Sequence, residues 1–68
     1  MKLTFVYSPS IIGSCPTIYR TDRGTIAIQG YAVDDAEGVV NPLPGERIVE
    51  VPIELLTKGL ALLEESQG

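Results

Sequence analysis

The chain has 68 residues, of which 44% are hydrophobic, and its formal net charge is −4 at pH 7. This length allows one domain at most, and five basic residues against nine acidic ones do not form the clustered cationic surface that direct nucleic-acid binding needs. One cysteine and no histidine exclude an internal disulfide and the usual zinc sites. So small a domain needs a partner chain or an unusually good core, and the apolar, acidic composition favours self-association or a partner with a basic surface.

The N-terminus has two interpretations. Met1 and Lys2, followed by a short apolar run and Cys15, loosely resemble a lipoprotein signal that ends at its acylated cysteine. The run is broken by Pro9, and its removal would delete a predicted strand. No apolar run is long enough to span a bilayer. We therefore expect a cytoplasmic protein and disfavour a lipid-anchored one.

The first predicted strand covers residues 2–7, where apolar and polar residues alternate. One side of this strand is expected to be half-buried and carries Leu3, Phe5 and Tyr7. Residues 8–16 are expected to form a loop because proline, serine and glycine interrupt the pattern. Within it, Ile11 and Ile12 either tuck under the sheet or become ordered on a partner.

A hairpin is predicted next, from two runs rich in β-branched and aromatic residues at 17–20 and 25–33. Between them, Asp22 can accept hydrogen bonds from the backbone just ahead of it, and Gly24 can take a positive φ. This combination is typical of a tight turn with a glycine bulge. Gly30 lies within the second run, where a glycine marks a bulge or a close approach of another backbone segment.

The longest predicted connection is 34–45, which is acidic at first and then rich in proline and glycine. Such loops often carry binding sites. Strand character returns over 46–51. A helix is predicted over 52–65, because Pro52 suits its first position and Glu54 meets the positive end of the helix dipole.

The predicted helix carries two apolar stripes, which are Ile53, Leu56, Leu60 and Leu63 on one side and Leu55 and Leu62 beside them. Together they are wider than one small sheet face needs. We expect Leu55 and Leu62 to face outward and to form, with the 34–45 loop, a surface that contacts another chain. The elements predict a single α+β domain over 1–68, a small three- to four-stranded antiparallel β-sheet with one C-terminal helix.

Few residues suggest chemistry. Cys15 has no histidine to activate it and no second cysteine to resolve it, so a structural role is favoured over a reactive thiol. Asp34, Asp35 and Glu37 could ligate calcium or magnesium, but their spacing matches no EF-hand loop, and a solvated acidic turn is favoured. The sequence shows no phosphate-binding loop, no catalytic carboxylate pair and no nucleophile with a base. We therefore expect no enzyme, no metal and no cofactor.

The residues expected to bind a partner lie on the helix, on the acidic loop and at the hairpin tip. They are Leu55, Leu62, Asp34, Asp35, Glu37, Asp22 and Arg23. Two functions of different classes stay open at this point. The chain is either a small regulatory module that binds another protein, or an accessory subunit that is stable only within a larger enzyme or secretion assembly.

Three segments carry a resemblance to a known family. Residues 14–18, 24–30 and 48–56 read Ser-Cys-Pro-Thr-Ile, Gly-Thr-Ile-Ala-Ile-Gln-Gly and Ile-Val-Glu-Val-Pro-Ile-Glu-Leu-Leu. A cysteine enters a short strand, a glycine starts a strand of alternating apolar residues, and an apolar strand runs into a Pro-x-Glu helix start. Over about 14–63 the chain resembles a family of very small actinobacterial regulatory proteins typified by BldB.

This resemblance implies a non-enzymatic regulator that acts through protein contact. Members of the family are often encoded beside a helix-turn-helix DNA-binding protein, and some are proposed to restrain that partner as an antitoxin does. The typifying member self-associates. The resemblance therefore implies transcription regulation, a helix-turn-helix protein as partner, and a homodimer.

Overall fold

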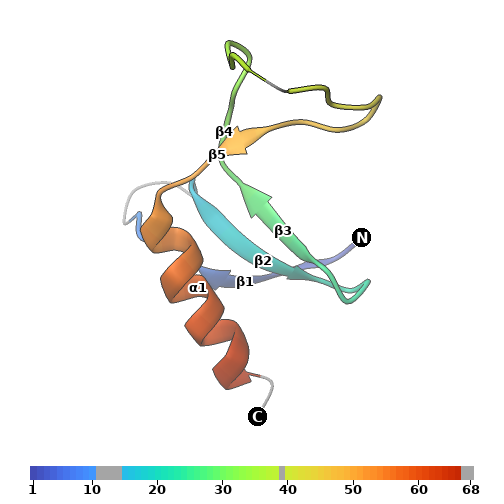
Figure 1. The fold of residues 1–68 in the computed structure, drawn as a ribbon. Helices are drawn as coiled ribbons and strands as arrows, with labels where there is room; N and C mark the ends of the chain where they lie inside the picture. The colour runs from blue at the N-terminus through green and yellow to red at the C-terminus, as the bar shows by residue number, and fades with distance from the viewer. Residues whose placement is uncertain (11–14, 39, 67–68) are drawn as a thin grey trace.

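The computed structural model describes residues 1–10, 15–38 and 40–66 and has an α+β fold (Figure 1). Three strands form an antiparallel sheet in the order β1-β2-β3, two shorter strands form a second antiparallel pair, and a helix follows. The elements are β1 (Leu3–Tyr7), β2 (Thr17–Thr21), β3 (Ile26–Gln29), β4 (Tyr31–Ala32), β5 (Val49–Glu50) and α1 (Ile53–Ser66). The predicted fold class is confirmed. The expectation for Ile11 and Ile12 falls outside the described residues.

The hairpin between β2 and β3 closes on the predicted glycine. Gly24 has a φ of 76°, and the N–H of Thr21 donates to the carbonyl of Thr25 at 2.9 Å. The side chain that organises the turn is that of Thr21, whose Oγ1 accepts the N–H groups of Arg23 and Thr25 at 3.1 and 3.2 Å. A threonine hydroxyl can bind backbone donors in a turn much as an aspartate does. The turn is confirmed, and its side-chain acceptor is corrected from Asp22 to Thr21.

A bulge in β1 changes the side to which this strand directs its residues. Phe5 lies opposite Tyr19, the register then shifts, and Tyr7 lies opposite Ile18. Residues directly opposite each other in an antiparallel pair share a face, so the bulge turns Tyr7 to the helix side while Phe5 stays on the outer side. The prediction that Leu3, Phe5 and Tyr7 share one half-buried side is wrong, and Leu3 and Phe5 are 50% and 62% exposed.

The core lies between α1 and the first two strands (Figure 1). Thr17 and Leu55 have no exposed surface, Ile18 is 2% exposed, and Gly59 is buried in the middle of the helix. A Cβ at Gly59 would overlap Cδ1 of Ile18. The glycine therefore lets the helix approach β2 closely, although the resulting core is small.

The predicted strand over 25–33 is broken at Gly30. A Cβ there would lie 2.7 Å from the carbonyl oxygen of Glu50 and 2.7 Å from Cγ1 of Val51. The backbone at Gly30 passes so close to the returning chain that the strand cannot continue in the same sheet. The strand predicted over 46–51 is likewise shorter, and it pairs with β4 instead of joining the main sheet.

Residues 31–38 and 40–50, which we call the arm, project away from the body formed by the main sheet and α1 (Figure 1). β4 and β5 pair at its base, and the N–H of Val33 donates to the carbonyl of Ile48 at 2.9 Å. The chain measures 39 × 26 × 20 Å, and its Cα radius of gyration of 13.2 Å exceeds the roughly 11 Å expected for a compact domain of this length. The arm therefore extends the molecule without enlarging its core.

Replacing Gly30 with alanine is expected to loosen the arm from the body. The added methyl group would meet the backbone carbonyl of Glu50, which cannot swing aside as the end of a flexible side chain can. Amide hydrogen exchange should show lost protection at Val33, whose N–H bonds across the base of the arm. The matched control is Gln29→Ala, at the exposed neighbouring position in β3. Unchanged protection at Val33 in Gly30→Ala would contradict this account of the junction.

Candidate protein-interaction surface

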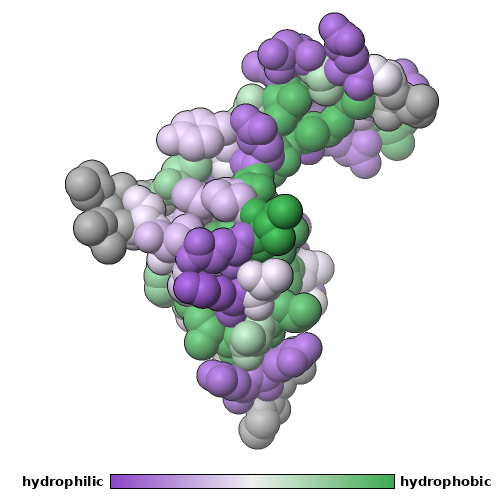
Figure 2. Space-filling model, turned by 60° about the vertical axis from the view of Figure 1, so that its left-hand side comes forward, coloured by the Kyte–Doolittle hydropathy of each residue, from purple (hydrophilic) through white to green (hydrophobic). Residues whose placement is uncertain are grey.

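The side of the molecule where α1 faces β3 is apolar and exposed. The helix packs mainly on β1 and β2, so the helix side of β3 is only partly covered. The exposed apolar residues here, which we call the β3–α1 face, are Ile26 and Ile28 of β3 with Ile53, Leu56 and Leu60 of α1. Their exposed fractions range from 40% to 79%. Figure 2 shows apolar surface on both the body and the arm, with polar groups interspersed. Exposed apolar patches are typical of interaction sites.

A shallow hollow separates the β2–β3 hairpin from the C-terminal half of α1. Its apolar lining comes from Ile26, Leu60 and Leu63, and its polar lining includes Arg20 and Glu64. Nη2 of Arg20 donates to the carbonyl oxygen of Leu63 at 3.0 Å. Because this bond satisfies one of the terminal carbonyls of the helix, it holds the end of α1 over β2 and keeps Leu60 in place beside β3.

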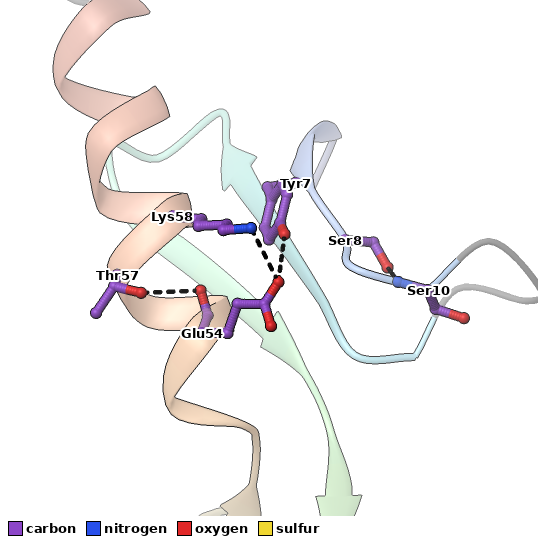
Figure 3. A network of polar contacts seen from close by, with 6 residues as sticks. All are labelled: Tyr7, Ser8, Ser10, Glu54, Thr57 and Lys58. Atoms are coloured by element: carbon purple, nitrogen blue, oxygen red, sulfur yellow. Dashed lines mark hydrogen bonds and ion pairs between the residues drawn. The ribbon is translucent and has the colours of Figure 1, made fainter.

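Polar contacts on the other side of α1 join the helix to β1 (Figure 3). The hydroxyl of Tyr7 donates to Oε1 of Glu54 at 3.3 Å, and Nζ of Lys58 lies 3.2 Å from the same oxygen. The hydrogen bond from Lys58 to Glu54 and the negative charge of that carboxylate raise the pKa of Lys58 above 10.5. These exposed contacts orient the start of the helix, and solvent screening keeps their contribution to stability small. The β1 side of the helix is thus polar where the β3 side is apolar.

The prediction of an outward stripe on α1 is wrong for Leu55. This side chain is fully buried against the sheet, with 0% exposure, and Leu62 lies at the margin beside β1 with 38% exposure. Leu56 and Leu60 are instead the exposed residues. Gly59 explains the orientation, because it lies one turn after Leu55 and lets that face of the helix approach β2.

The other predicted site residues lie far apart. Asp34, Asp35 and Glu37 are exposed on the arm, whereas Asp22 and Arg23 are exposed at the tip of the hairpin. Figure 1 shows the arm and this tip at opposite ends of β3. The structure therefore does not bring the predicted residues into one surface.

The arm carries a net charge equal to that of the whole chain. Its charged residues, all exposed, are Asp34, Asp35, Glu37, Glu46, Glu50 and Arg47. Five carboxylates against one arginine give −4, which is the formal charge of the chain, so the four acidic and four basic residues elsewhere cancel. The molecule thus combines an acidic arm with an electrically neutral body.

The sequence pattern did not identify the two isoleucines of β3 as exposed. A helix is about 10 Å wide and neighbouring strands lie about 4.8 Å apart, so one helix covers about two strands. The third strand of the sheet, which carries Ile26 and Ile28, is left open. The sequence did contain one indication of this exposure. It predicts a single helix for three or four strands, and one helix cannot cover all of them.

Cys15 and the acidic residues do not form a metal-binding cluster among the described residues. Cys15 is half-buried and its thiol is free. In the described ranges, no three His, Cys, Asp or Glu side chains gather closely enough to hold a metal ion. α1 has 14 residues, and the described part of the chain contains no helix with the length and hydropathy required to cross a membrane.

Comparison with known proteins finds no matching family model, no similar curated protein and no similar solved structure. The chain is therefore characterised by its own structure. It is a small α+β domain with an open apolar face and a projecting acidic arm.

Proposed function

We propose that this chain is a non-enzymatic regulatory module that binds and modulates another protein. The observation that carries the proposal is the imbalance between exposed and buried apolar side chains. Among the described residues, 13 large hydrophobic side chains are exposed and two hydrophobic ones are buried. Keeping apolar surface in water is unfavourable by about 25 cal/mol per Å², and a protein partner removes that surface from water.

The negative charge of the arm supports a proposal that the partner has a basic surface. Its net charge of −4 is concentrated within residues 31–50, and complementary charge steers and orients protein association. Proteins that bind DNA have such basic surfaces. The helix-turn-helix regulator implied by the family resemblance therefore fits the arm, which would cover its DNA-binding surface in an antitoxin-like manner. We propose that this takes place in the cytoplasm.

The test removes charge from the arm without altering its length. Asp34→Asn combined with Asp35→Asn is expected to weaken binding to a helix-turn-helix protein encoded beside this chain by about tenfold. Titration calorimetry at low and at physiological salt measures the affinity, and the variant should show the weaker salt dependence. The matched control, Glu64→Gln with Glu65→Gln, removes the same charge from the end of α1 and should keep the affinity.

The outcomes separate the proposal from its alternative. Equal loss of affinity in both double variants would show that overall charge, and not the arm, attracts the partner. Absence of binding by the unmodified chain would contradict the regulatory role. Specific binding to a subunit of a larger enzyme or secretion complex would instead favour an accessory subunit.

A further inference from the structure

A pocket of about 350 Å³ lies at the base of the arm, where β4 and β5 meet the body. Its lining consists of Pro16, Tyr31, Glu50, Val51 and Pro52. Four of these side chains present mainly carbon, and the fifth is a carboxylate. Ligand pockets in proteins typically have volumes of about 300–1,000 Å³ and apolar walls that surround a few polar groups. The pocket therefore has the size and the composition of a binding site.

The pairing of β4 with β5 places the ring of Tyr31 next to the carboxylate of Glu50. The two residues lie directly opposite each other in this antiparallel pair, so their side chains project from the same face. The Cβ atoms of such a pair are about 4.5–5.5 Å apart, and one ligand can therefore contact both side chains. Both are exposed, and the exposed fraction of Tyr31 is 67%. The pocket thus offers an aromatic face and a negative charge side by side.

The remaining walls of the pocket are held by the fold. Val51 lies against Gly30, where a Cβ would be 2.7 Å from Cγ1 of Val51. Pro16 lies directly before β2 and Pro52 directly before α1, and the ring of each proline fixes its φ. The walls are therefore in place before a ligand binds, which lowers the entropic cost of binding.

The charge of the pocket selects a cation. In the described part of the chain, no basic side chain pairs with the carboxylate of Glu50. The arginine of the arm, Arg47, lines a different hollow and donates to the carbonyl oxygen of Glu46 at 2.9 Å. An anion would be repelled by Glu50 and by an arm whose net charge is −4. A neutral apolar group would displace water from the carboxylate without pairing it, which is unfavourable.

We propose that this pocket binds an arginine side chain of the partner protein. The inference rests on the proposed function and deepens it, since it names the side chain that the partner contributes. A guanidinium is planar and weakly hydrated, so it can stack on the ring of Tyr31 while its N–H groups donate to Glu50. The methylene stem of the arginine then lies against Pro16, Val51 and Pro52. A lysine ammonium is more strongly hydrated and cannot stack or pair in this bidentate way.

The test titrates the full chain with the peptide acetyl-Ala-Arg-Ala-amide and follows the backbone amides by NMR. The amides of Tyr31, Glu50 and Val51 should shift and saturate, with a dissociation constant on the order of 1–10 mM. The same peptide with citrulline in place of arginine keeps the shape without the charge and should bind at least about tenfold more weakly. The corresponding lysine peptide should bind about threefold more weakly.

Variants of the chain locate the binding site. Glu50→Gln and, separately, Tyr31→Leu should each weaken binding of the arginine peptide by about fivefold or more. Tyr31→Phe keeps the ring and should keep the affinity. The matched control, Glu46→Gln, removes the same charge from the arm outside this pocket, and its amide oxygen can still accept the N–H of Leu43. The spectrum of each variant without peptide reports whether the arm is intact.

Several outcomes would overturn the inference. They are the absence of saturable shifts, shifts confined to other residues, equal binding of the citrulline or lysine peptide, and equal weakening by Glu46→Gln. The titration uses no partner protein, so its result is independent of the binding test with Asp34→Asn and Asp35→Asn. A pocket that binds arginine in a chain that binds no helix-turn-helix protein would uphold this inference and contradict the proposed function. The reverse result would overturn this inference alone.

Discussion

Replacing Leu55 with alanine is expected to remove a large part of the protein's stability. Leu55 has 0% exposure and is one of two buried hydrophobic side chains among the described residues. Truncating a fully buried leucine costs about 2–5 kcal/mol. A domain of this size has a total stability of roughly 3–10 kcal/mol, so this single change removes a large part of it. Urea denaturation followed by circular dichroism measures the loss.

The matched control for Leu55→Ala uses the same substitution on the same helix. Leu60 is 57% exposed, so Leu60→Ala should cost less than about 1 kcal/mol, measured at concentrations where the chain is monomeric. Equal losses of stability at the two positions would contradict an orientation of α1 in which Leu55 faces the sheet. A larger loss at Leu60 than at Leu55 would mean that the helix faces the sheet with the opposite side.

Gly59→Ala is expected to destabilise the protein although it improves the helix. Alanine is about 1 kcal/mol better than glycine in a helix interior. The added Cβ, however, would overlap Cδ1 of Ile18, a side chain that is 2% exposed and packed in the core. Overpacking of this kind costs about 1–3 kcal/mol. We expect a net loss of stability in urea denaturation, opposite in sign to the helix propensity.

A second substitution isolates the cause of that loss. Ile18→Val removes the Cδ1 atom that the new methyl group would meet, and alone it should cost about 0.5–1.5 kcal/mol. In the double variant, Gly59→Ala should become neutral or stabilising, giving a coupling free energy above about 1 kcal/mol. Additive effects of the two substitutions would contradict a close approach of Gly59 to Ile18.

The parts of the fold that depend on neighbouring residues could be predicted from the sequence. Gly24 marks the hairpin turn because a positive φ is a property of that residue and its immediate neighbours. Pro52 and Glu54 mark the start of the helix for the same local reason, and α1 begins at Ile53. The strands β1 and β2 follow from alternation and β-branched residues within each run.

The parts that depend on distant residues could not be predicted in this way. The break at Gly30 results from the approach of Glu50, which is 20 positions away along the chain. The orientation of α1 was open because leucines occupy several sides of the helix, and a wide stripe does not indicate a unique direction. The contact between Gly59 and Ile18 decides it. The candidate interface was misplaced for the same reason, since it is the surface that this packing leaves uncovered.

Because the arm is acidic and the body is neutral, the electric field around the molecule is strongly asymmetric. Its longest dimension is 39 Å, whereas charges in solution are felt over about 8 Å at physiological ionic strength. An approaching protein therefore senses the two ends independently. A cationic surface pulls the arm toward itself before the body makes contact, so the molecule arrives in one orientation and the encounter rate falls as salt is added.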